Sequence, residues 1–169
     1  MDSGLVLGFF DGIHKAHRAV IESAFKYSDN VIVVTFGESP SVYFDNTAEY
    51  IFSRKNNIEK IQSLGVNKIV EFNFADIAEL KAEEYVERLV NKFHPISIST
   101  GFNHTFGYKK KGNPEMLKKL SSKYGFIYEC VDEIVEKDEV ISSTLIKDYL
   151  KKGDVEYANH LLGSNFIIE

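Results

Sequence analysis

The sequence has few of the residues that mark secreted, membrane or zinc-binding proteins. A single cysteine, Cys130, excludes an intrachain disulfide, and together with five scattered histidines it offers no Cys-x-x-Cys zinc framework. A reducing, cytoplasmic setting is therefore expected. The first residues lack the basic lead and apolar run of a signal peptide, and no stretch approaches the ~18 apolar residues of a membrane span.

The chain also has no excess of positive charge. Its 20 Lys and Arg against 25 Asp and Glu give a formal net charge of -5, which argues against affinity gained by neutralising a nucleic-acid backbone. With 169 residues, 44% of them hydrophobic, the chain can bury one core of ordinary size. We expect a single domain over residues 1–169 that binds neither nucleic acid nor membrane. The composition does not specify an oligomeric state.

Apolar runs alternate with helical patterns along most of the chain. Strands are predicted at residues 5–7, 31–36, 68–72, 96–100 and 126–131, and helices at 14–27, 53–64, 82–93 and 114–123. Such alternation predicts an α/β fold, a doubly wound parallel sheet of about five strands. Two further helical patterns, at 145–150 and 154–162, predict a helical C-terminal end.

Ligands bind such sheets beyond the carboxyl ends of the strands. The polar segments expected there are 8–17, 35–44, 101–113 and, after the last strand, 141–147. Two familiar phosphate loops are excluded. Residues 8–12 do not spell Gly-x-Gly-x-x-Gly, and residues 107–112 have P-loop spacing but continue Asn113-Pro114 where Lys-Ser/Thr is required. The chain is neither a standard dinucleotide dehydrogenase nor a P-loop NTPase.

His14 and His17 stand three residues apart at the start of the first predicted helix. Zinc would need further ligands that no local motif supplies, so no metal site is predicted. A pair of surface or capping histidines is the ordinary alternative. The third interpretation is an anion site, where neutral or protonated imidazoles and free helix N–H groups face a polyphosphate. The position after the first strand favours this third interpretation.

Four segments carry a resemblance to a known family. They are residues 7–17 (LGFFDGIHKAH), 33–40 (VVTFGESP), 101–107 (GFNHTFG) and 141–147 (ISSTLIK). The first resembles Gly-x-Phe-Asp-Gly-x-His-x-Gly-His, the third Gly-x-(Asn/Asp)-Phe-x-Phe-Gly, and the fourth Ser-Ser-Thr-x-Ile-Arg. In this order they resemble the nucleotidyltransferase superfamily, in the form found in bacterial FAD synthetases (FMN adenylyltransferases). The helical end is similar too, so the resemblance covers essentially the whole chain.

The resemblance implies a Rossmann-like sheet of the nucleotidylyl transferase type and a reaction of ATP with FMN that gives FAD and pyrophosphate. Mg²⁺ would be carried by the ATP. Because a phosphate oxygen of FMN attacks the α-phosphorus directly, no protein nucleophile is needed. The implied catalytic residues are His14, His17 and Lys147. The implied ATP-binding residues are Gly8, Phe9, Phe10, Asp11, Gly12, His14, His17, Ser142, Ser143, Thr144 and Lys147.

The acceptor side is less specific. The residues implied to bind the flavin or another acceptor are Thr35, Phe36, Pro40, Phe44, Asn103 and Phe106. Aromatic residues at strand ends are more often core, and the serines and threonine at 142–144 could equally cap a helix. Lysines 109–111 form either a solvated loop or a patch that steers anions.

Four residues depart from the family pattern. Ala16 puts a methyl group where the nucleotide would approach, and Lys147 replaces a bidentate arginine by a point charge. Glu38 adds negative charge near a dianionic acceptor, and His104 stands where an aromatic residue is usual.

These departures keep two alternatives open. One is a nucleotidyltransferase for another phosphorylated acceptor, such as pantetheine phosphate or nicotinate mononucleotide. The other is a degenerate flavin- or ATP-binding regulatory module. The usual bacterial protein continues into a riboflavin kinase barrel that is not found in these 169 residues, so phosphorylation of riboflavin is not expected.

Overall fold

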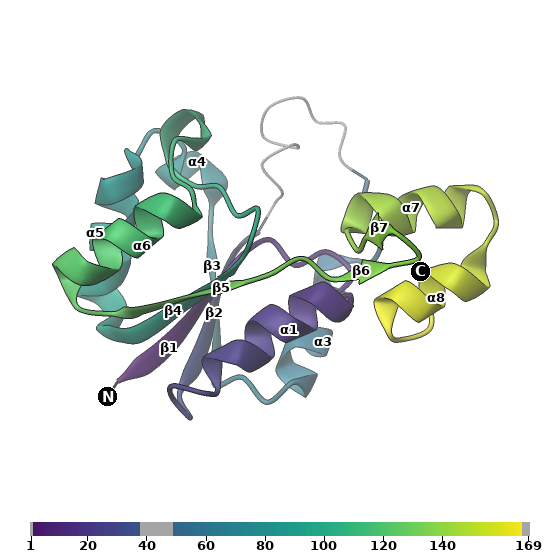
Figure 1. Ribbon diagram of the computed structural model, residues 1–169, viewed down its shortest axis with the longest axis horizontal. Helices are drawn as coiled ribbons and strands as arrows, with labels where there is room; N and C mark the ends of the chain where they lie inside the picture. The colour runs from purple at the N-terminus through teal and green to yellow at the C-terminus, as the bar shows by residue number, and fades with distance from the viewer. Residues whose placement is uncertain (1, 38–48, 167–169) are drawn as a thin grey trace.

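A parallel sheet forms the centre of the protein, whose computed structural model describes residues 2–37 and 49–166. The five strands run in the order β3-β2-β1-β4-β5, and every neighbouring pair is parallel (Figure 1). Their bounds are β1 Ser3–Leu7, β2 Val31–Phe36, β3 Lys68–Phe72, β4 Pro95–Gly101 and β5 Ile127–Val131. The predicted doubly wound α/β fold is confirmed.

Helices cover both faces of this sheet (Figure 1). One face is covered by α1 (Lys15–Ala24) and α3 (Arg54–Ser63), and the other by α5 (Ala82–Phe93) and α6 (Pro114–Tyr124). Alternate residues of β1 therefore enter different cores: Val6 packs with Ile21 of α1, and Leu5 with Leu89 of α5. All of β1 is buried, as expected for a central parallel strand.

The predicted helical end is present as α7 (Ser143–Lys151) and α8 (Val155–Leu162). These two helices lie beyond the carboxyl ends of the strands (Figure 1). They build a third apolar cluster, in which Ile146 and Leu161 pack with Ile51 and Phe52 from the segment before α3. Within residues 2–37 and 49–166, no helix has the length and apolarity needed to cross a membrane.

Four short elements were not predicted. They are α4 (Phe74–Ile77), the 3-10 helix η1 (Tyr108–Lys110), and a hairpin of β6 (Val135–Glu136) and β7 (Glu139–Val140). Lys137 and Asp138 make the hairpin turn with φ of 49° and 63°, a geometry usually signalled by Asn-Gly or Asp-Gly. Residues 141–147 follow the last strand of the sheet as predicted, and this hairpin lies between the two.

The strand order has a switch point between β1 and β4. From β1 the chain moves outward to β2 and β3, and then returns to the other side of β1 for β4 and β5. The connections on the two sides leave the sheet in opposite directions, which opens a crevice beyond the carboxyl ends of the two strands. The loops after β1 and β4 therefore form the two walls of that crevice.

Candidate active site

A cleft of about 260 Å³ lies at this switch point. The loops after β1, β4 and β5 line it, together with the residues that follow β7. Seven of the predicted ATP-binding residues contribute to its wall: Gly8, Phe9, Phe10, His14, His17, Ser142 and Ser143. Among the other residues that line the cleft, four are polar or charged and were not assigned to ATP from the sequence: Asn103, His104, Asp132 and Glu133.

The two histidines face each other as a stacked pair. His14 is the N-cap of α1, and its Nδ1 accepts a hydrogen bond of 3.2 Å from the backbone N–H of His17. The ring centroids are 3.5 Å apart, and the edge of Phe10 packs on His17 at 5.2 Å. Since Nδ1 of His14 is an acceptor, a neutral His14 carries its proton on Nε2. Capping and anion binding are therefore compatible uses of the same residue.

Both imidazoles are neutral at pH 7. Burial lowers the pKa of His14 to about 4, and burial together with the charge of His14 lowers the pKa of His17 well below its usual value. Two stacked cations at this separation would repel each other, so neutrality agrees with the geometry. Of the two protonation states considered from the sequence, the structure favours neutral N–H donors.

A strained turn places His14 at the helix start. Gly12 has a φ of 88°, and a Cβ built on it would meet Ile51 Cδ1 at 2.9 Å, so no larger residue fits there. Ile13 follows with a φ of 48° and a fully buried side chain. A β-branched residue in the left-handed region is unfavourable, and core packing holds it there.

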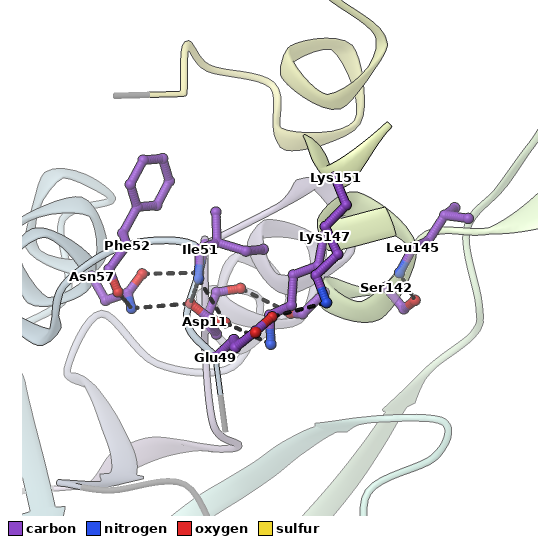
Figure 2. A network of polar contacts seen from close by, with 11 residues as sticks. Asp11, Glu49, Ile51, Phe52, Asn57, Ser142, Leu145, Lys147 and Lys151 are labelled. Atoms are coloured by element: carbon purple, nitrogen blue, oxygen red, sulfur yellow. Dashed lines mark hydrogen bonds and ion pairs between the residues drawn. The ribbon is translucent and has the colours of Figure 1, made fainter. Parts of the chain in front are cut away.

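The carboxylate of Asp11 is buried, does not line the cleft, and takes part in a polar network (Figure 2). It accepts the N–H of Ile51 at 3.0 and 3.1 Å and lies 3.3 Å from the ammonium of Lys147. The next residue, Gly12, donates its N–H to Asn57 Oδ1 at 2.9 Å. Asp11, Gly12 and Lys147 therefore anchor the loop and are absent from the described cleft wall, as is Thr144.

The start of α7 forms another part of the cleft wall. Ser142 is the N-cap and accepts the N–H of Leu145 at 3.1 Å, while the Ser143 hydroxyl donates to the carbonyl of Asp11 at 2.9 Å. The capping interpretation is confirmed for Ser142. The first N–H groups of α7 have no intrahelical partner, because helix geometry provides none. The cap uses the N–H of Leu145, so those of Ser143 and Thr144 remain available to a ligand in the cleft.

Comparison with known proteins identifies the family. Residues 1–145 match the profile of the FAD synthetase family. The chain belongs to this family. It is 31% identical over 167 residues to a bifunctional riboflavin kinase/FMN adenylyltransferase of Listeria monocytogenes, a match that covers 94% of this chain and 53% of that protein. The chain thus spans about half the length of the curated relatives it matches.

Solved structures agree with this assignment of the fold. A crystal structure titled macrolide-efflux protein, from Streptococcus pneumoniae, superposes with a TM-score of 0.83 at 28% identity, covering 98% of this chain and 56% of that one. A pantoate-beta-alanine ligase of Francisella tularensis gives a TM-score of 0.61 at 17% identity, covering 96% of this chain and 70% of that one. The second likeness is one of fold alone.

This FAD synthetase family chain has a second, aromatic cavity of about 610 Å³ beside the cleft. Phe36 and Phe106, both predicted acceptor residues, line it, and so do Phe74 and Tyr85. The rings of Phe36 and Phe74 meet edge to face at 5.4 Å, and those of Tyr85 and Phe106 lie 6.0 Å apart. Lys109 and Lys110, which form either a solvated loop or an anion-steering patch, also line this cavity.

The remaining predicted acceptor residues are distributed differently. Asn103 lines the cleft, and Thr35 lines a small pocket of about 60 Å³ that it shares with Phe36. Pro40 and Phe44, like Glu38, lie outside the described residues. Tyr85 was missed because it sits on the buried face of the amphipathic helix α5, where the sequence pattern is the same for a core residue and for a cavity wall.

Proposed function

We propose that this chain transfers AMP from ATP to FMN, giving FAD and pyrophosphate. The observation that carries the proposal is a shared wall. The segment 101–106 separates the cleft of the stacked histidines from the aromatic cavity: Asn103 and His104 face the first, and Thr105 and Phe106 face the second. A nucleotide and a flavin bound on the two sides of this wall would meet at its edge.

On the ATP side, the triphosphate would lie between the histidine pair and the start of α7. The neutral Nε2–H of His14, its partner His17 and the free N–H groups of α7 are preorganised donors for the charge that develops at the α-phosphorus and on the departing pyrophosphate. They need no reorientation at the moment of reaction. This donor set supports a role for His14 and His17 in stabilising the transition state.

On the acceptor side, the aromatic cavity suits a planar, largely apolar ring system. The phosphate of FMN would extend past Asn103 into the cleft. One of its oxygens would form a bond to the α-phosphorus while the bond from that phosphorus to the bridging oxygen breaks, releasing pyrophosphate. The protein positions the two substrates and stabilises the developing charge, so the reaction requires no nucleophilic side chain.

The charged residues of the cleft support a magnesium ion that is carried by the substrate. None of the described residues lining it is Lys or Arg, and two of them are Asp132 and Glu133. In the described ranges, no group of three or more His, Cys, Asp or Glu could hold a metal ion. We therefore propose that Mg²⁺ arrives bound to the triphosphate, as it usually does with nucleotides. The low cysteine content likewise supports a cytoplasmic location.

The direct test is incubation of the purified chain with ATP, Mg²⁺ and FMN, with FAD resolved by chromatography. Parallel reactions contain riboflavin, pantetheine phosphate or nicotinate mononucleotide in place of FMN. FAD formed from FMN, and no product from the other three, is the expected result. If another acceptor is adenylylated instead, that compound and not FMN is the substrate. Saturable binding of ATP or FMN without any product would instead indicate a regulatory module.

A further inference from the structure

His104 stands out in the wall between the cleft and the aromatic cavity. Its Nε2 atom is enclosed by protein and has no hydrogen-bond partner among the described residues. The ring packs nearly parallel to that of Phe106, with centroids 5.8 Å apart. A phenyl ring would make the same packing contact without leaving a polar atom unpaired. A histidine here leaves one ring nitrogen buried and unpaired, a cost that Phe would not have, and this points to a use for its other ring nitrogen beside the cleft.

The protonation state of His104 follows from its surroundings. Burial lowers its pKa to about 4, so the ring is neutral at pH 7 and carries a single N–H. If the proton were on Nε2, the enclosed nitrogen would be an unpaired donor, which is the costlier arrangement. The other nitrogen, Nδ1, is not among the enclosed unpaired side-chain atoms of residues 2–37 and 49–166. It is the nitrogen left to meet a ligand.

We infer that His104 is a positioning residue that donates its Nδ1–H to a phosphate oxygen of the acceptor. The inference rests on the proposed function and assigns a specific atom to the phosphate end of FMN. His104 lines the cleft with Asn103, whereas the ring side of the wall is formed by Thr105 and Phe106. The contact therefore reaches the phosphate and not the isoalloxazine ring. Such a donor orients the attacking oxygen toward the α-phosphorus.

The test compares FMN with riboflavin, which has the same ring and ribityl chain but no phosphate. Dissociation constants for both, and for ATP, are measured by calorimetry for the wild-type chain, His104→Phe and His104→Gln. For His104→Phe we expect FMN affinity to fall about tenfold, riboflavin and ATP affinities to stay within twofold, and the melting temperature to stay equal or rise. His104→Gln, which keeps an N–H donor, should recover part of the FMN affinity.

The outcomes separate this inference from the proposed function. Wild-type protein that fails to bind FMN would overturn the proposed function. Wild-type protein that binds FMN, with an unchanged FMN-to-riboflavin preference in His104→Phe, would overturn the role of His104 alone. Equal losses for both flavins with a lower melting temperature would also overturn it, because they would show a structural role. His94→Asn is the matched control, since His94 is exposed and ends α5 in the left-handed conformation that Asn tolerates.

Discussion

The carboxylate of Asp11 and the ammonium of Lys147 form an ion pair, with Oδ2 and Nζ 3.3 Å apart (Figure 2). The side chain of Asp11 is only 3% exposed, and that of Lys147 is 27% exposed. Together with the bond from Ser143 to the Asp11 carbonyl, the pair ties the start of α7 to the loop that carries the histidines. In this structure the ammonium of Lys147 contacts the loop. The predicted contact of Lys147 with the ATP phosphates stays a prediction.

Removing Lys147 therefore tests two roles at once. Lys147→Met leaves the buried carboxylate without its cation, so we expect the free energy of unfolding to fall by about 1–3 kcal/mol. If the lysine only anchors the loop, the dissociation constant of ATP should change less than tenfold. Urea denaturation and ATP calorimetry check the two values.

Asp11→Asn and the double variant complete a mutant cycle. Asn still accepts the N–H of Ile51 but carries no charge, so the Lys147→Met substitution should matter less in the Asp11→Asn background. Additive effects would show that the pair does not contribute as an ion pair. A loss of ATP affinity well beyond tenfold in Lys147→Met, with unchanged stability, would establish the phosphate contact.

His17 provides the sharpest test of the proposed chemistry. Its ring lines the cleft, stacks on His14 and contacts Phe10. Loss of one preorganised donor typically lowers the rate about 10²–10³-fold, and we expect His17→Ala to lower kcat by that amount with little change in melting temperature. Turnover is measured as FAD formation under saturating ATP. His94→Asn should keep wild-type turnover, and a change of only a few-fold in His17→Ala would place the phosphates elsewhere.

The sequence predicted the regular elements well where local signals and packing agree. The run VIVVTF predicted β2 at Val31–Phe36, and the amphipathic pattern predicted α5 at Ala82–Phe93, both with the observed bounds. The β6–β7 hairpin was missed because its turn uses Lys137 and Asp138 and contains no glycine. The partner of Lys147 was missed for a different reason. It lies 136 residues away in Asp11, and no local pattern encodes such a contact.

The buried histidines make stability depend on pH. Burial lowers the pKa of His14 and of His104 to about 4, while unfolded histidines titrate near 6.5. Between these values the unfolded chain binds protons that the folded chain does not, so the free energy of unfolding falls as the pH falls from about 6.5 toward 4. Each such histidine adds up to about 1.4 kcal/mol per pH unit to the slope.

Denaturant titrations at pH 7.5, 6.0 and 5.0 measure this slope. His104→Phe removes one of the titrating groups, so its stability should decline less steeply than that of the wild type across this window. The pKa values of Glu83 and Glu136 are also lowered, but they affect stability mainly below pH 4.5. Between pH 7.5 and 5.0 the slope therefore reports on the histidines. Equal slopes for the two proteins would contradict the burial assigned to His104.

Ala16 allows a test of the departure from the family pattern inside the cleft. Its methyl group belongs to the cleft wall in the first turn of α1. Ala16→Gly should widen the nucleotide pocket and raise ATP affinity a few-fold, at a cost of about 0.5–1 kcal/mol in helix stability. Ala19→Gly, in the same helix but outside the described cleft wall, should have the same stability cost and leave ATP affinity unchanged. Equal ATP affinities of Ala16→Gly and Ala19→Gly would show that the methyl group of Ala16 does not narrow the site.

Glu136 joins the unpredicted hairpin to the start of α1. One carboxylate oxygen pairs with Lys15 Nζ at 3.0 Å, and the other pairs with His160 of α8. The hydrogen bond from Lys15 holds the pKa of Glu136 below its usual value, so the pair is charged at pH 7. Because the hairpin leads directly into Ile141 and Ser142, this contact positions the start of α7 against the histidine loop.

Glu136→Gln keeps the shape of the side chain and removes its charge. We expect KM for ATP to rise several-fold, because the α7 N–H groups are less firmly placed, and kcat to change less. Glu83→Gln is the control, since it removes the charge from an ion pair with Lys123 that joins α5 to α6, away from the cleft. Steady-state kinetics of FAD formation distinguish the two variants. Equal KM values would mean that core packing of Ile141 and Ile146 alone fixes the helix, independently of the hairpin contact.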